Sequence, residues 1–234
     1  MTNERVDEVS RPLFLRVLKK GELTFAINHA ATGLIIKKAY PDVPMTVILV
    51  SVQLVEILWV VLNLSGLEKT TTEDRVRSVS DIHLKHMPFS HSVVSTILLA
   101  VGAWVVIALG FNAIHVGTAV GLGICSHLGL DLISHARDIA IAPFLDKRKF
   151  GLGLYERPAV AFVFETIYGI FCWWVYGGGS ALFWTILFFN LANASFFLKA
   201  IPGPERFLAH RPMWITALVA LQIVVTAIFV NLFS

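Results

Sequence analysis

Charge is scarce in this chain of 234 residues. Asp, Glu, Lys and Arg together make up 15% of it, whereas 56% of its residues are hydrophobic. Soluble domains carry about 25% charged residues, so this composition argues against a water-soluble fold and indicates a lipid bilayer as the solvent. The net charge of +3 does not favour nucleic-acid binding. The two cysteines, Cys125 and Cys172, lie inside apolar runs and are too few for a disulfide scaffold.

Several familiar catalytic signatures are also missing. The chain has no His-Glu-x-x-His, no Gly-x-Ser-x-Gly, no Walker loop and no Gly-x-Gly-x-x-Gly after a strand. These absences argue against a zincin-like protease, an α/β-hydrolase, a P-loop nucleotidase and a dinucleotide-binding enzyme.

Long apolar runs are what the sequence has instead. A helix needs about 20 mostly apolar residues to cross roughly 30 Å of hydrocarbon. A run over residues 23–39 is short, so it could span or instead be re-entrant or interfacial. Six longer runs cover residues 44–64, 91–111, 113–135, 158–177, 180–199 and 213–233. The sequence therefore predicts an all-α integral membrane protein, a polytopic bundle of six to seven transmembrane helices.

The domain organisation follows from these runs. We expect residues 1–22 to form a cytoplasmic or interfacial segment that can lie along the membrane surface. Residues 23–234 form the transmembrane domain, and its two long polar segments, 65–90 and 136–157, are predicted to be cytoplasmic loops.

Basic residues are sorted between the two sides. The N-terminal segment, the two long loops and the 199–212 link hold seventeen of the nineteen Lys and Arg, and only Lys37 and Lys38 fall on the other side. The positive-inside rule then places the loops in the cytoplasm. We expect a bacterial inner-membrane protein with a cytoplasmic N-terminus and an external C-terminus if residues 23–39 span the bilayer.

A few ionisable side chains lie inside the apolar runs. A charged group there costs roughly 2.5–3.5 kcal/mol on insertion scales, so each is a candidate functional residue. Counted from the cytoplasmic ends of the helices, they fall about 10 Å or less below the surface. The set comprises His29, Glu56, His91, His127, Asp131, His135 and Glu165. Unrelated structural exceptions would not share one depth, so we expect a single site.

The strongest local pattern is His127, Asp131 and His135, at positions i, i+4 and i+8. At about 100° per residue these side chains share roughly 80° of a helix face, and Asp138 joins them if the helix continues. Imidazole and carboxylate groups on one face suit a divalent ion such as zinc, manganese or iron. A lone intramembrane His or acid can instead bond to a neighbouring helix, and this alternative stays open for His135 or Glu165 taken singly.

Two further histidines, His83 and His86, precede the 91–111 run. With His91, the first residue of that run, they make three histidines within nine residues. Histidines in a solvated loop are common, so His83 is a weak candidate. His91 is stronger because the start of a helix would fix its position, with Ser90 as the expected N-cap.

Four motifs, in order, resemble those of the YdjM-type family of membrane-bound, metal-dependent hydrolases: Asn28-His29, Leu54-Val55-Glu56, His86-x4-His91-Ser92 and Ser126-His127-x3-Asp131. The resemblance covers roughly residues 25–175. The departures from the family pattern are Glu56 in place of a first Asp, Leu58 and Trp59 in place of a second Asp and its His, and Met87, Pro88 and Ser90 within the His-rich motif.

More distantly, the order His, acid, His, His-x3-Asp, His, acid is similar to that of zinc-dependent phospholipase C and the related single-strand nucleases, which hydrolyse phosphodiesters with several zinc ions. In that pattern a His stands four residues before the final acid. Here Ala161 stands four residues before Glu165. We therefore expect one or two ions, zinc first, with manganese or iron as alternatives.

Together, the intramembrane residues and the resemblance predict the following roles. The expected metal ligands are His29, Glu56, His91, His127 and Asp131, with His86 and His135 as second choices. Glu165 is expected to be a general base or a further ligand, and His135 is grouped with it as a catalytic side chain.

The predicted activity is hydrolysis of a phosphoester or related bond in a lipid headgroup by metal-activated water at the cytoplasmic side, with membrane lipid as both solvent and substrate. The first alternative is a transporter or metal-handling permease that uses the same residues. Its path should continue outward, where the helices offer only Gln53, His115 and a few hydroxyl or amide groups. A membrane scaffold without activity is the third interpretation.

Overall fold

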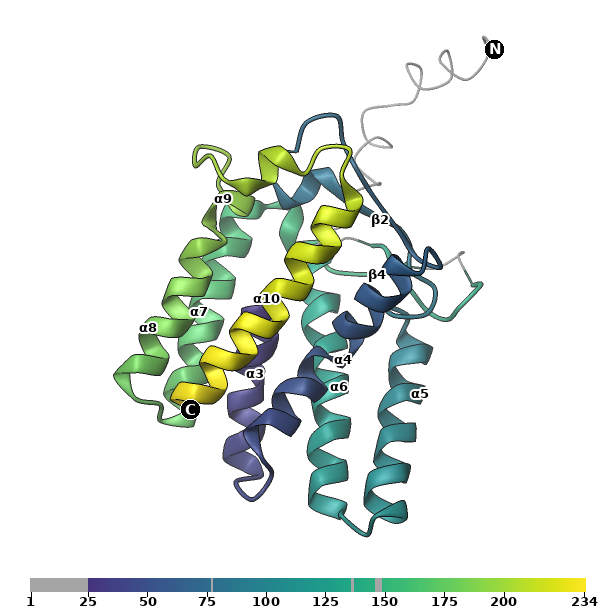
Figure 1. Cartoon of the computed structure of the whole chain (residues 1–234), viewed down its shortest axis with the longest axis vertical. Helices are drawn as coiled ribbons and strands as arrows, with labels where there is room; N and C mark the ends of the chain where they lie inside the picture. Colours follow the sequence, from purple (N-terminus) through teal and green to yellow (C-terminus); the bar gives the residue numbers. More distant parts are fainter. Residues whose placement is uncertain (1–24, 77, 136, 146–148) are drawn as a thin grey trace.

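The computed structural model describes residues 25–76, 78–135, 137–145 and 149–234, and the predicted 1–22 segment lies outside them. The described part is a helical bundle (Figure 1). Its α-helices are α3 (Ala26–Ala39), α4 (Met45–Leu64), α5 (Val93–Trp104), α6 (Ile114–Ser134), α7 (Pro158–Tyr176), α8 (Ser180–Ala192), α9 (Ala194–Phe197) and α10 (Pro212–Phe233). A π-helical turn, Val105–Gly110, extends α5.

Among the described residues, five helices are long and apolar enough to cross a membrane: α4, α5 with its π-helical extension, α6, α7 and α10. This confirms the all-α class and is consistent with a membrane protein. Helices α3 and α8 have 14 and 13 residues, which corresponds to about 20 Å each, less than the hydrocarbon thickness. A count of six to seven spans stays a prediction.

Proline and glycine set several helix ends. Pro158 and Pro212 occupy the first positions of α7 and α10, where the missing N–H has no intrahelical partner to lose. Gly177 ends α7 in the left-handed conformation, with φ +82°, and its N–H donates to the carbonyls of Trp173 and Trp174. These signals explain why the α7 boundaries match the predicted run so closely.

Helix α3 lies at the centre of the bundle. It packs against α4, α6, α7, α8 and α10, and ten of its fourteen residues are buried on all sides. The main apolar core gathers around it and includes the fully buried Trp59 of α4. Because protein rather than lipid surrounds α3, its length need not match the bilayer, which explains how so short a helix is accommodated.

The predicted continuous helix over residues 180–199 is wrong. Helix α8 ends at Ala192, the single turn α9 follows, and Leu198 is extended. The side chain of Asn193, between the two helices, accepts a hydrogen bond of 2.9 Å from Gln222 Nε2 of α10. Phe196 and Phe197 pack on Phe25, with ring centroids 5.4 and 5.0 Å apart. These tertiary contacts end the helix at Ala192, although the apolar run continues to residue 199.

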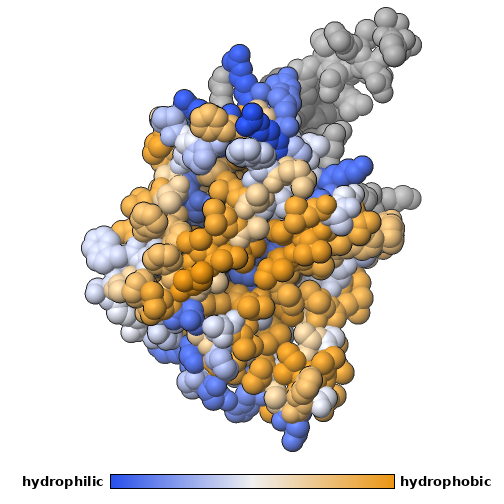
Figure 2. Space-filling view, in the orientation of Figure 1, coloured by the Kyte–Doolittle hydropathy of each residue, from blue (hydrophilic) through white to orange (hydrophobic). Residues whose placement is uncertain are grey.

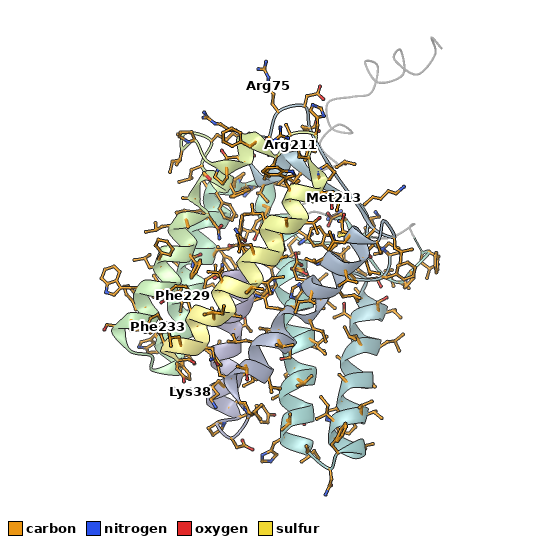
Figure 3. All side chains as sticks on the ribbon, viewed as in Figure 1. Lys38, Arg75, Arg211, Met213, Phe229 and Phe233 are labelled. Atoms are coloured by element: carbon orange, nitrogen blue, oxygen red, sulfur yellow. The ribbon has the colours of Figure 1, made fainter. Side chains whose placement is uncertain are left out.

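The two ends of the bundle differ. The polar segments between α4 and α5, between α6 and α7, and between α9 and α10 gather at the upper end in Figure 1, and the short turns lie at the lower end. We call the upper end the loop end. Figure 3 shows Arg75 and Arg211 there and Lys38 at the opposite end. Figure 2 shows a broad hydrophobic band between hydrophilic ends, as expected for a chain that crosses a bilayer.

Two short antiparallel strand pairs complete the loop end. Strand β1 (Lys69–Thr72) pairs with β2 (Ile82–His86), and β3 (Ile139–Ala140) pairs with β4 (Lys149–Phe150). The first pair brings residue 68 next to residue 90, and the second runs beside the start of α5, where Ser92 bridges to Ala140. Both pairs therefore lie against the elements that carry the site.

Candidate metal centre

Five predicted ligands come together inside the loop end of the bundle. His29 is on α3, Glu56 on α4, His91 just before α5, and His127 and Asp131 on α6, and all five are buried. They form two overlapping groups, His29 with His127 and Asp131, and Glu56 with His91 and His127. Within each group one ligand atom from each residue lies within 4.8 Å of the others. His127 belongs to both groups, so they make one cluster.

Asp131 is at the middle of this cluster. Four histidines turn Nε2 toward its carboxylate, at 3.5 Å for His29, 3.6 Å for His91, 3.3 Å for His127 and 3.9 Å for His135. Glu56 Oε2 closes the other side, 3.1 Å from His91 Nε2 and 3.5 Å from His127 Nε2.

Helix α6 ends within the predicted stripe. It stops at Ser134, and His135 is extended with ψ 148°. The condition under which Asp138 would join the stripe, a helix that continues past His135, is therefore not met. His135 nevertheless faces Asp131, and its Nδ1 lies 3.3 Å from Asp138 Oδ1. The turn thus places His135 at the rim of the cluster with a carboxylate behind it.

Hydrogen bonds fix which nitrogen of the His127 and His135 rings faces the cluster. His127 Nδ1 lies 2.8 Å from the carbonyl oxygen of Val52, which can only accept, so Nδ1 carries the proton. The Asp138 carboxylate acts in the same way on His135 Nδ1. In the neutral form of both rings the lone pair is then on Nε2 and is directed inward, which is the tautomer of a metal-binding imidazole.

A buried carboxylate orients His91 through a serine. Ser90 Oγ donates to Glu68 Oε2 at 2.5 Å, so His91 Nδ1, at 2.8 Å, must donate to the same oxygen. Glu68 is 1% exposed and also accepts from the N–H groups of Phe89 and Ser90, at 3.0 and 2.9 Å. The neutral form of His91 therefore also presents its Nε2 lone pair to the cluster.

This arrangement corrects the expected role of Ser90. The N-cap of α5 is Ser92, whose Oγ accepts from Ser95 N at 3.2 Å. Sequence reasoning also missed Glu68, because it is one of several acids in a polar segment and no local spacing relates it to His91. Only the pairing of β1 with β2 brings it there.

The Nε2 atoms of His91 and His127 face carboxylates at close range. They lie 3.1–3.6 Å from carboxylate oxygens, which only accept, so a neutral ring would turn its Nε2 lone pair toward another acceptor. Such contacts are unfavourable unless a proton or a cation lies between them. Two ligands about 2.0–2.1 Å from a tetrahedral ion are about 3.4 Å apart, so the distances fit one shared ion.

Unpartnered atoms support the same fit. Nδ1 and Nε2 of His29, Nε2 of His127 and Oδ1 of Asp131 are buried without a hydrogen-bond partner among the described residues. Each such atom costs about 1–3 kcal/mol if left unsatisfied. The rings of His29 and His127 stack with centroids 3.7 Å apart, which brings two imidazoles to one place. Neutral imidazoles with two carboxylates suit zinc, manganese or iron.

Glu165 lies outside these two groups. It is buried on α7 and accepts a hydrogen bond from Asn28 Nδ2, at 2.9 Å, and another from the Tyr155 hydroxyl. Asn28 precedes His29, so Glu165 is one α3 residue away from the cluster. Neither Tyr155 nor Asn28 was predicted from the sequence. Tyr155 offered no signal because it follows a glycine-rich loop, whereas Asn28 stands in the motif that carries His29.

The remaining candidates fall elsewhere. The side chains of His83 and His86 on β2 lie outside the described ones, although the backbone of His86 pairs with Lys69. His115 is at the opposite end of the bundle, where its Nδ1 lies 3.1 Å from Asp42 Oδ2 and both side chains are exposed. It takes no part in the cluster, as expected.

No protein-family model, curated protein or solved structure matches this chain. The geometry of the cluster and its place in the bundle are therefore the features that indicate a function.

Proposed function

We propose that this chain is a membrane-embedded, metal-dependent hydrolase that cleaves a phosphoester or related bond of a lipid headgroup. The observation that carries the proposal is the set of imidazole Nε2 atoms facing the carboxylates of Asp131 and Glu56 at 3.1–3.6 Å. A divalent cation can take the place of the protons between these groups, and zinc is the first choice for it, as one or two ions.

In this proposal His29, His91, His127, Glu56 and Asp131 hold the ion. When bound, a divalent ion polarises the scissile oxygen and lowers the pKa of a coordinated water to about 7. Hydrogen bonds from Nδ1 hold three rings in one tautomer and orientation. His127 donates to the Val52 carbonyl, His135 donates to Asp138, and His91 donates to Ser90, which is held by Glu68.

His135 is the better placed of the two proposed catalytic residues. It lies at the rim of the cluster, and the Asp138 carboxylate accepts from its Nδ1, an arrangement that suits a histidine that takes up and releases a proton at Nε2. Glu165 is held by two neutral donors beside α3. We propose it as a base only for a substrate that reaches between α3 and α7.

The position of the cluster supports a lipid substrate. Asp131 is three residues before the end of α6, so it lies about 5 Å from that end along the helix axis, and His91 is two residues before α5 begins. Both helices are candidate spans. A site at that level meets the headgroup and ester region of a lipid. We further propose that the basic loop end faces the cytoplasm of a bacterial inner membrane.

The first test is the metal itself. Purified protein should contain one or two equivalents of a divalent ion by elemental analysis, and the double variant His127→Ala/Asp131→Ala should contain none. Asp42→Ala, which removes an exposed carboxylate at the other end, is the matched control and should keep the full content. Stoichiometric metal in the double variant would refute the ligand assignment.

The second test is the reaction. Lipid phosphoesters should be hydrolysed by protein in vesicles, hydrolysis should stop with chelator and return with Zn²⁺, and His135→Gln should lose most of the rate while keeping its metal. Solute or ion flux into vesicles that survives chelation, without hydrolysis, would favour a transporter. Neither activity in metal-loaded protein would favour a scaffold.

A further inference from the structure

The polar segment between α6 and α7 carries large apolar side chains on its surface. We call residues 141–145 with 149–152 the apolar loop. Its exposed members are Phe144 at 80%, Leu145 at 58%, Phe150 at 48% and Leu152 at 81%. Single exposed apolar residues are ordinary, but four within nine residues of a loop form a patch that calls for a partner.

Three backbone bonds fix the height of the apolar loop. Val94 N, in the first turn of α5, donates to the carbonyl of Ile141 at 2.9 Å. At the other end, Leu152 N donates to Leu132 at 2.8 Å and Gly153 N donates to His135 at 2.7 Å. Val94 and Leu132 belong to the ends of two candidate spans. The loop is therefore held at the level where α5 and α6 leave the hydrocarbon.

The conformation of Phe144 keeps its side chain outward. Its φ is +69°, in the left-handed region that bulky side chains rarely adopt. The ring meets Phe89 only at an edge, with centroids 5.6 Å apart, and stays 80% exposed. A strained backbone that holds an aromatic ring in the open is consistent with a surface that is covered in the working protein.

The surroundings indicate which partner covers it. The apolar loop lies beside the upper end of α5 in Figure 1, and at the right-hand edge of Figure 2 hydrophobic residues continue from the apolar band up to this level. Arg137 and Lys149, both exposed, flank the apolar side chains. Apolar groups beside basic ones, at the level of the headgroups, match the chemistry of a leaflet that contains anionic lipid.

We propose that the apolar loop inserts into the lipid leaflet, with Phe144, Leu145, Phe150 and Leu152 among the upper acyl chains and Arg137 and Lys149 at the phosphates. The polar segment that contains the apolar loop begins directly after His135, and Gly153 N at its other end donates to the carbonyl of His135. Insertion therefore brings the surface of the leaflet to the rim of the metal centre. The insertion itself does not depend on the proposed hydrolase activity.

Spin labels measure the depth of each position. Cys125→Ala removes the exposed cysteine, and Cys172 is buried and stays unlabelled. Single variants Phe144→Cys and Leu152→Cys are labelled in vesicles of phosphatidylethanolamine and phosphatidylglycerol. Asp74→Cys, whose native side chain is 97% exposed in another loop of the same end, is the aqueous control, and Leu109→Cys, on an exposed position of a candidate span, is the lipid control.

Labels at residues 144 and 152 should collide more often with oxygen than with a water-soluble nickel chelate, as at residue 109, and the ratio should be reversed at residue 74. Nickel collisions at 144 and 152 that match those at residue 74 would overturn the proposal. Spin–spin broadening that grows with the protein-to-lipid ratio would also overturn it, because a second copy would then cover the patch. Neither result requires turnover, so the outcome stands apart from that of the hydrolase tests.

Discussion

Glu68→Gln should weaken metal binding although it barely changes the shape of the side chain. The carboxylate of Glu68 accepts from Ser90 Oγ, which in turn accepts from His91 Nδ1. In the amide, Oε1 can keep the two backbone N–H bonds, and the NH₂ group then points at Ser90 Oγ. Ser90 Oγ then accepts from the amide, which leaves its own proton free to turn toward His91 Nδ1. In that arrangement the neutral ring carries its proton on Nε2, the atom that faces the cluster.

The size of the effect follows from one disabled ligand. Removing a group that orients a ligand through a hydrogen bond usually costs 10–100-fold in metal affinity. Each factor of ten is about 1.4 kcal/mol, so Glu68→Gln should lose about 1.4–2.8 kcal/mol of binding free energy. His127 and His135 keep their own acceptors, so binding should weaken without being abolished.

Competition between the protein and a chromophoric chelator for Zn²⁺ measures this change. Glu156→Gln, which alters an exposed acid in the segment between α6 and α7, is the matched control and should bind as the native chain does. Ser92→Ala should cost about 1 kcal/mol of stability through the lost α5 cap but leave Zn²⁺ affinity unchanged. Equal Zn²⁺ affinity in Glu68→Gln and the native chain would refute the proposed proton arrangement.

Three further predictions concern packing and charge. Gly123→Ala should destabilise the protein by about 1–3 kcal/mol, because a Cβ there would collide with the side chain of Ser51 on α4. Gly129→Ala is the control, since its Cβ would meet no neighbouring atom, and it should cost no stability. Thermal unfolding in detergent compares the two variants. Trp59→Ala should cost about 3–5 kcal/mol in the same assay, because it empties a fully buried site in the core, and a loss below 1 kcal/mol would contradict that packing. The hydrogen bond from His115 lowers the pKa of Asp42, so His115→Ala should raise that pKa toward its ordinary value in a carboxyl-carbon NMR titration. The stabilisation from the pair is present above the unfolded pKa of about 3.9 and is lost as pH falls through the lower folded pKa. An unchanged pKa in the variant would contradict the pairing.

The parts of the site that the sequence predicted are those set by local rules. Hydrocarbon thickness and helical periodicity define the apolar runs, and residues four apart on a helix share a face, so His127 and Asp131 were expected together. A shared depth then linked them to His29, Glu56 and His91. The structure brings these five side chains together.

The parts that the sequence did not predict depend on contacts between distant segments. Glu68 reaches Ser90 across 22 positions only because two strands pair. Helix α8 stops where Phe196 and Phe197 turn back onto Phe25, a gain that apolar periodicity does not record. The proton on Nδ1 of His127 likewise depends on an acceptor from another helix, the carbonyl of Val52.

The central place of α3 has a consequence for biogenesis. It is the first described helix to leave the ribosome, yet it is not among the helices apolar enough to cross a membrane alone, and it carries His29 and two lysines. Its covering helices α7, α8 and α10 are made later. Full covering of α3 must therefore wait for synthesis of the last span. In chains stalled on the ribosome before α10, α4 already anchors the chain, but a cysteine placed in α3 should still react with a thiol reagent. His29 reaches its final packing only when the chain is nearly complete.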